Sequence, residues 1–294
     1  MSNVKIPQQE KPHGAFTVHR VLNKGFIRLV DCMPSPCDPY SISADDAIAQ
    51  MARVSYGGGT ENKRDNSGLI NYLIENRHTS PFEGAVFKFH VKMPIFVARQ
   101  WFRHRTASAN EVSARYSVLT DDFYIPDPER CQGQDNKMKQ GSDGALDNAD
   151  EILSFIEAES SNSYVKYTEL LNMGLSRELS RSVLPVNIYT EMYWMMNLHN
   201  LLHFVKLRIS SHAQYEIRVY AEKIKEIVKD IAPLTLEAWE DHIEKSTSLS
   251  NYEIQLIKNS SQINIDRVRD EISSLGWSER KKDSFISKIK KFIK

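Results

Sequence analysis

The sequence predicts a protein of the mixed α+β class, because it contains both strand-like and helix-like stretches. Residues 16–33 and 85–93 alternate apolar with other side chains, which is typical of half-buried strands. Much of the remaining chain places apolar residues three and four apart, which indicates amphipathic helices. The 294 residues include 41% hydrophobic and 26% charged residues, so the chain can bury a substantial core as an ordinary globular protein.

The first part of the chain is expected to form a hairpin followed by two helices. Residues 16–33 contain the turn signal Asn23-Lys24-Gly25, so two antiparallel strands should meet there. Ser43 is a suitable N-cap for a helix over residues 44–54, which the glycines after Tyr56 should end. A second amphipathic helix is expected over residues 66–77.

The middle of the chain combines a strand, a short helix and a polar loop. A compact turn over residues 78–83 leads into the strand at residues 85–93. Pro94 suits the first position of a short buried helix, since its missing N–H costs nothing there. The helix leads into a glycine-free polar loop from Arg103 to Tyr116.

Helices should predominate in the second half. They are expected at about residues 145–173, 177–184, 199–208, 213–231 and 234–242. Residues 185–196 suit a buried strand but could also begin as a helix. The stretch after residue 250 contains two short amphipathic segments and ends in a basic run. We therefore expect a flexible arm (1–15), a main domain (16–245) with a mobile insertion (131–150), and a helical basic extension (246–294).

Composition argues against several classes of protein. Lys+Arg and Asp+Glu each number 38, so the net charge of +0 is unlike that of a dedicated nucleic-acid binder. Three cysteines, Cys32, Cys37 and Cys131, do not form a disulfide framework and are expected to be free thiols. No signal peptide and no run of roughly 18 apolar residues is present, so we expect a cytoplasmic protein without a membrane partner.

The loop Arg103–Tyr116, RHRTASANEVSARY, is the densest polar segment of the chain. Its three arginines offer planar forks that suit phosphate or carboxylate groups. Glu111 can balance these charges or accept hydrogen bonds from a ligand. The alternative is a solvated charged loop without a ligand.

A second polar group lies between Asn197 and His212. Asn197 and Arg208 share a face if one continuous helix carries both, with His199 and His203 roughly opposite. An arginine in this apolar stretch needs a carboxylate, a carbonyl or a ligand as its partner. The spacing of His199 and His203, and of His212 and Glu216, is that of metal ligands, yet H-E-x-x-H is absent and we expect no metal. Hydrogen-bonded core histidines are the alternative.

The loop sequence resembles the signature of flavin-dependent thymidylate synthases, R-H-R-x-x-S-x-N-E-x-S-x-R-Y, at every fixed position. The resemblance extends to HTSPFE, FVARQWFR, RSVLP and LRISSHAQYE, and covers about residues 16–235. It implies a twisted, mostly antiparallel sheet flanked by helices, with residues 16–245 as the catalytic domain of a homotetramer whose active sites combine subunits. It also implies reductive methylation of dUMP to dTMP, with 5,10-methylenetetrahydrofolate as carbon donor, NADPH as reductant through FAD, and no enzyme nucleophile.

The resemblance also assigns site residues by motif position. The dUMP set is Gln100, Trp101, Phe102, Arg103, Glu111, Val112, Ser113, Ala114, Arg115, Arg181 and Arg208. The FAD set is His78, Ser80, Arg103, His104, Arg105, Thr106, Glu111, Asn197, His199 and His203. Arg208 is expected to be catalytic, favouring loss or polarisation of the uracil N3 proton by stabilising negative charge. Two departures from the commoner family pattern are His199, in place of arginine, and Ser80, in place of threonine.

Two other functions compete with this one. The arginine loop and basic tail could form a nucleic-acid-binding module, against which the zero net charge and the lack of aromatic stacking motifs argue. A catalytically inactive relative could serve as a scaffold, but the chain retains Arg103, Glu111, Arg115, Arg181 and Arg208.

Overall fold

The computed structural model describes residues 16–36, 38, 40–57, 65–135, 141–260, 264–277 and 279–292. The expected arm at residues 1–15 and Cys37 lie outside the described residues. The chain divides into two compact units, Met1–Glu244 and Lys245–Lys294. In the described part of the chain, no helix is both long and apolar enough to cross a membrane.

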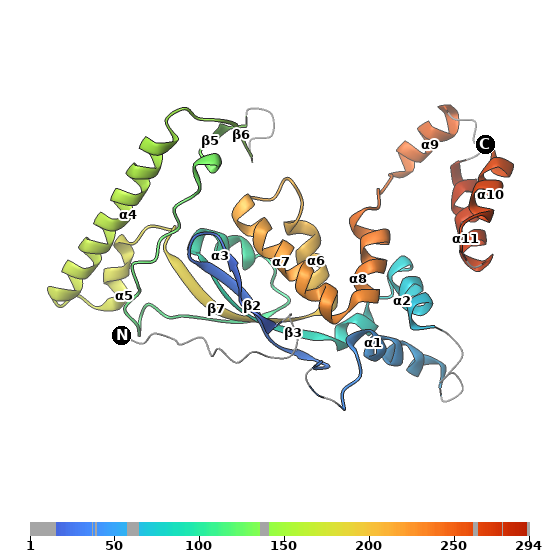
Figure 1. Ribbon diagram of the computed structural model, residues 1–294, viewed down its shortest axis with the longest axis horizontal. Helices are drawn as coiled ribbons and strands as arrows, with labels where there is room; N and C mark the ends of the chain where they lie inside the picture. Colours follow the sequence, from blue (N-terminus) through green and yellow to red (C-terminus); the bar gives the residue numbers. More distant parts are fainter. Residues whose placement is uncertain are drawn as a thin grey trace. The chain divides into compact units, whose positions relative to one another are not determined.

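The main β-sheet of the first unit has five strands (Figure 1). Its strands, in spatial order, are β1 (His19–Val21), β2 (Gly25–Met33), β3 (Val86–Pro94), β7 (Tyr189–Asn197) and β4 (Ser108–Glu111). Every neighbouring pair is antiparallel, which confirms the predicted α+β class with a mostly antiparallel sheet. The hairpin at residues 16–33 is also confirmed, and the ambiguous stretch at 185–196 contains a strand.

Helices pack against this sheet and against one another. They are α1 (Ala44–Arg53), α2 (Asn66–Glu75), α3 (Ile95–Trp101), α4 (Ala149–Asn172), α5 (Arg177–Ser180), α6 (Leu198–Arg208), α7 (Tyr215–Ile231) and α8 (Pro233–Trp239). All correspond to predicted segments. Helices α6 and α7 pack together, α3 packs against α7 and the sheet, and α1, α2 and α8 form a second group (Figure 1).

The core lies between the sheet and helices α3, α6 and α7. Phe87 and Phe89 on β3 are fully buried, because alternate residues of a strand face the same side. Trp101 packs edge-on against Trp194, with a ring-centroid distance of 5.2 Å, and against Phe204 at 4.7 Å. This aromatic cluster fixes the C-terminal end of α3, where the polar loop begins.

Helix α8 is capped from a distant part of the chain. Its own N-cap residue, Ala232, has no side chain that could accept a hydrogen bond. The buried Asp45 carboxylate of α1 instead accepts from the Leu234 N–H at 2.8 Å and the Thr235 N–H at 3.0 Å. The Thr235 hydroxyl donates to the same carboxylate at 2.6 Å, so Asp45 ties α8 to α1.

Two predictions about local structure are corrected. Residues Ser108–Glu111 of the expected loop form β4, because they pair with β7 at the edge of the sheet. Pro94 ends β3 and stands before the first residue of α3 instead of within the helix. Helix α6 ends at Arg208, as the sequence predicted, and Asn197 is its N-cap.

The insertion and the extension also contain more structure than the sequence indicated. Within residues 131–150, strands β5 (Gln132–Gln134) and β6 (Ser142–Ala145) form a small hairpin. The described part of the second unit contains α9 (Asn251–Ser260), α10 (Ile265–Ser273) and α11 (Glu279–Ile289), where two segments were expected.

Candidate functional site

Two cavities are lined by eight of the residues that the sequence assigns to a site. The first, called here the β4 pocket, measures about 230 Å³ and lies beside β4 and β7. Five residues of the predicted dUMP set line it: Phe102, Glu111, Val112, Ala114 and Arg181. Arg99, Tyr189 and Thr190 also line it and were not predicted. The β4 pocket therefore joins the motif loop to α5 and the start of β7.

Glu111 is held in place by the pairing of β4 with β7. Glu111 lies opposite Met192 in the sheet, and the Val112 N–H donates to the Glu191 carbonyl at 2.9 Å. The hydroxyl of buried Thr190 donates to Glu111 Oε1 at 2.5 Å. This bond orients one oxygen of the exposed Glu111 carboxylate, and the carboxylate has further acceptor capacity for a ligand N–H or O–H.

Two arginines of the predicted dUMP set meet at Glu178. The Arg115 Nε donates to the Glu178 carboxylate at 2.9 Å, and the Arg181 Nε donates to the Glu178 backbone carbonyl at 3.2 Å. Arg115 and Glu178 are both about half exposed, so this ion pair contributes little to stability. Both guanidinium groups are thus anchored on the same residue, and arginine forks are suited to a doubly charged phosphate.

Arg208 has the partner that its apolar helix requires. Its Nε donates to His104 Nε2 at 3.1 Å, and its Nη2 donates to the Gln100 carbonyl at 3.2 Å. Burial, with added repulsion from Arg208 and His203, lowers the pKa of His104 to about 4. The imidazole is therefore neutral at pH 7 and can accept the Arg208 hydrogen bond. Burial and the nearby Arg103 lower the pKa of Arg208 from its usual value.

The remaining residues of the predicted dUMP set differ in accessibility. The Trp101 side chain is fully buried in the aromatic core. The Gln100 amide donates to the Gln214 side chain, which links α3 to the segment before α7. Arg103 is exposed, and Ser113 Oγ accepts from the Arg115 N–H at 3.3 Å within the loop.

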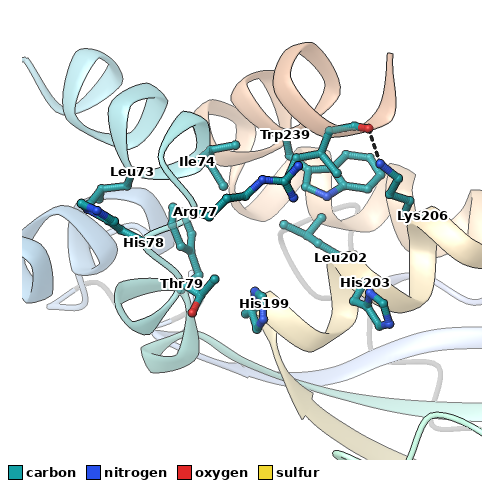
Figure 2. A pocket seen from close by; sticks show the side chains of 12 residues that line it. Leu73, Ile74, Arg77, His78, Thr79, His199, Leu202, His203, Lys206 and Trp239 are labelled. Atoms are coloured by element: carbon teal, nitrogen blue, oxygen red, sulfur yellow. Dashed lines mark hydrogen bonds between the residues drawn. The ribbon is translucent and has the colours of Figure 1, made fainter. Parts of the chain in front are cut away.

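The second cavity, called here the histidine pocket, measures about 120 Å³ (Figure 2). His78, His199 and His203 of the predicted FAD set line it. Its other lining residues are Leu73, Ile74, Arg77, Thr79, Phe82, Leu202, Lys206, Trp239 and Ile243. None of these twelve residues is an aspartate or a glutamate, so the charged groups that line the pocket are cationic.

Four other members of the predicted FAD set, described next, do not line this pocket. Ser80 begins a short 3₁₀ turn, Ser80–Gly84, and is exposed. Asn197 is the N-cap of α6, and its Oδ1 accepts from the Asn200 N–H at 3.0 Å. Arg105 and Thr106 are exposed on the loop before β4.

His104 connects the two groups of residues. Its ring lies 6.2 Å from the His203 ring, while its Nε2 accepts from Arg208. The structure therefore brings Arg208, His104 and His203 into one continuous polar series, although they come from two distant segments.

The four residues with metal-ligand spacing do not assemble. The buried Glu216 accepts from the Tyr124 hydroxyl at 3.0 Å, whereas His212 is exposed in the segment after α6. Among the residues that the structure describes, no group of three or more His, Cys, Asp or Glu side chains could hold a metal ion.

The sequence interpretation did not include Arg77, Lys206, Arg99 or Thr190. Lys206 could have been found, since it lies seven residues after His199 and three after His203 on one helical face. For Arg77 and Thr190 no comparable signal exists, because their positions depend on the end of α2 and on the pairing of β7 with β4.

Comparisons with known proteins agree with these observations. A family model described as "Thymidylate synthase complementing protein" matches residues 39–234. A protein of Thermus thermophilus named "Flavin-dependent thymidylate synthase" is 52% identical over 238 residues, covering 81% of this chain and 84% of its own. Proteins with the same name from Dictyostelium discoideum and Rickettsia bellii are 48% and 45% identical, covering 85% and 88% of this chain, and 83% and 91% of their own.

Two solved structures of one similar protein also match this chain. The UMP/dUMP methylase PolB from Streptomyces cacaoi, bound with 5-Br dUMP, superposes with a TM-score of 0.67 at 31% identity. The match covers 78% of this chain and 100% of that one. The same methylase bound with 5-Br UMP gives a TM-score of 0.66 at 32% identity, over 78% of this chain and 99% of that one.

Proposed function

The chain belongs to the family of flavin-dependent thymidylate synthases, and from this premise we propose that it methylates dUMP reductively to dTMP. The proposed carbon donor is 5,10-methylenetetrahydrofolate, and the proposed reductant is NADPH acting through FAD. The observation that carries the proposal is the arrangement in which Arg208 donates to the His104 ring and to the Gln100 carbonyl.

Arg208 is the proposed catalytic residue. The His104 ring and the Gln100 carbonyl hold its guanidinium in one orientation, and neither partner carries a negative charge that would neutralise it. Such a fixed cation can stabilise the negative charge that develops on uracil as the N3 proton is lost or polarised. Greater electron density at C5 then favours its attack on the one-carbon donor without an enzyme nucleophile.

The β4 pocket is the proposed dUMP site. Arg115 and Arg181 both donate to Glu178, and their guanidinium groups would bind the 5′-phosphate. Glu111, oriented by Thr190, can accept from a ligand hydroxyl or N–H. This geometry supports the nucleotide assignment, which the 5-Br dUMP bound to the similar Streptomyces methylase also favours.

The residues around the histidine pocket fit a phosphate-containing flavin. The pocket offers cationic and neutral N–H donors and no carboxylate, as a dinucleotide diphosphate requires. His78, His199 and His203 would hold the cofactor, with His104 between it and Arg208. When bound, FAD supplies the hydride chemistry of the reaction. The neutral His104 ring keeps the Arg208 side chain in position and keeps one further positive charge out of the site.

We also propose that the working form is a homotetramer with shared active sites. The loop residues Arg103, Arg105 and Thr106 are exposed in the single chain, and β4 is an edge strand. Polar motif residues on an open sheet edge can be covered by a second copy of the chain or by ligand.

An absorbance spectrum of the purified protein tests the proposed function. We expect a flavin spectrum that bleaches on anaerobic addition of NADPH, faster when dUMP is present, followed by dTMP formation on addition of the folate. A protein that binds no flavin even after incubation with FAD would refute the proposal.

A further inference from the structure

Arg77 has a backbone conformation that arginine rarely adopts. Helix α2 ends at Glu75 with Asn76 as its C-cap, and beyond it the Arg77 N–H donates to the Ile74 carbonyl and the His78 N–H to the Leu73 carbonyl. This hydrogen-bond pattern is a Schellman motif, in which the residue after the C-cap is left-handed and usually glycine. Arg77 occupies that position with φ 60°. A side chain at this strained position is a reason to look for a function.

The Arg77 side chain projects into the histidine pocket. In Figure 2 its guanidinium points from the end of α2 toward Leu202 and Trp239. The Schellman motif therefore turns the chain so that Arg77 and His78 both line the pocket. Glycine would suit the backbone better, but it would remove a cation from this lining.

Helix α6 supplies a second cation on the opposite side of the pocket. His199, His203 and Lys206 are spaced by four and three residues, so they share one face of α6. The Lys206 Nζ donates to the Ile243 carbonyl at 2.5 Å, which uses one of its three N–H donors and holds the ammonium at the pocket (Figure 2). Arg77 and Lys206 thus lie on two different elements that face the same cavity.

The volume and the lining residues of the histidine pocket limit which ligands can bind there. A volume of about 120 Å³ is too small for a complete dinucleotide, since ligand sites usually measure roughly 300–1,000 Å³. It has room for one anionic group of a larger ligand. Arginine, lysine and histidine donors without a carboxylate are complementary to phosphate.

We propose that Arg77 and Lys206 form a phosphate subsite that holds a phosphate group of an adenine dinucleotide. FAD and NADPH both carry such phosphates, and the inference rests on the proposed function in that respect. The two cations compensate for His199, which stands where the family resemblance leads one to expect an arginine. In this proposal, arginine occupies the left-handed position 77 because its positive charge binds the phosphate.

The test measures binding of FAD, riboflavin and NADPH to flavin-free, full-length protein by fluorescence titration. The variants are Arg77→Asn, which tolerates a left-handed backbone, and Lys206→Gln. Exposed Lys229 of α7 lies outside the pocket lining, so Lys229→Gln is the control for a changed net charge. Each pocket variant should weaken binding of FAD, NADPH or both by about tenfold, the loss of one charge-assisted hydrogen bond. Riboflavin, which lacks phosphate, and the control variant should show wild-type binding.

The dinucleotide whose binding weakens identifies the source of the phosphate. Unchanged binding of both dinucleotides to both pocket variants would overturn the inference, and so would an equal loss of riboflavin binding. If the wild type binds no flavin, the proposed function fails separately. The subsite is then tested with inorganic pyrophosphate, which should raise the Tm of the wild type and not of Arg77→Asn; an equal effect on both would refute the subsite as well.

Discussion

Acid should destabilise this protein partly through His104. Its ordinary pKa is 6.5, and in the folded chain burial, Arg208 and His203 lower it to about 4. Between these two pH values the unfolded chain binds a proton at this residue that the folded chain does not bind. Stability therefore falls as the pH is lowered from 6.5 toward 4, and His104 adds no such penalty above pH 6.5.

The structure sets the size of this effect. A difference of about 2.5 between the folded and unfolded pKa values corresponds to at most about 3.4 kcal/mol, at about 1.36 kcal/mol per pKa unit. His104 is only half-buried, so solvent screens part of this energy. We expect about 1–2 kcal/mol of unfolding free energy to be lost through His104 between pH 7 and pH 4.5.

Urea unfolding at pH 7 and pH 4.5 measures this loss in the wild type and in His104→Gln. Glutamine does not titrate, so the variant should lose about 1–2 kcal/mol less than the wild type over that interval. All other titrating groups are common to both proteins and cancel in the comparison. Parallel losses in the two proteins would refute the reasoning, as would an NMR titration of His104 with a midpoint near 6.5.

Three further predictions concern single side chains. Arg208→Ala should abolish dTMP formation while FAD remains bound, as measured by product assay and flavin absorbance; loss of FAD would show that the residue is misassigned. Asp45→Ala should lower the unfolding free energy by about 3 kcal/mol, because the N–H groups of Leu234 and Thr235 lose a buried charged acceptor; a change below about 1 kcal/mol in urea would contradict this capping role. Arg77→Gly should raise stability by about 0.5–1 kcal/mol, since glycine adopts the left-handed backbone without a Cβ penalty; a lower Tm would contradict the strain argument.

Local patterns in the sequence were sufficient to predict most helices and strands. Ser43 caps α1 as expected, accepting from the Asp46 N–H at 3.1 Å, because capping depends only on neighbouring residues. The β1–β2 hairpin follows from a short turn signal between two apolar runs. The motif RHRTASANEVSARY was sufficient to indicate the family, because its residue types suit ligand binding and all lie in one segment of the sequence.

Only the tertiary structure decided how distant segments meet. Ser108–Glu111 has no alternating apolar pattern, and it is a strand because β7 offers an unpaired edge beside it. Arg208 reaches His104 and the Gln100 carbonyl, about one hundred residues away, because α3 and α6 pack against the same aromatic cluster. The histidine pocket joins the end of α2, the face of α6 and the end of α8. Such contacts depend on the packing of whole elements, and residue spacing within one segment carries no information about that packing.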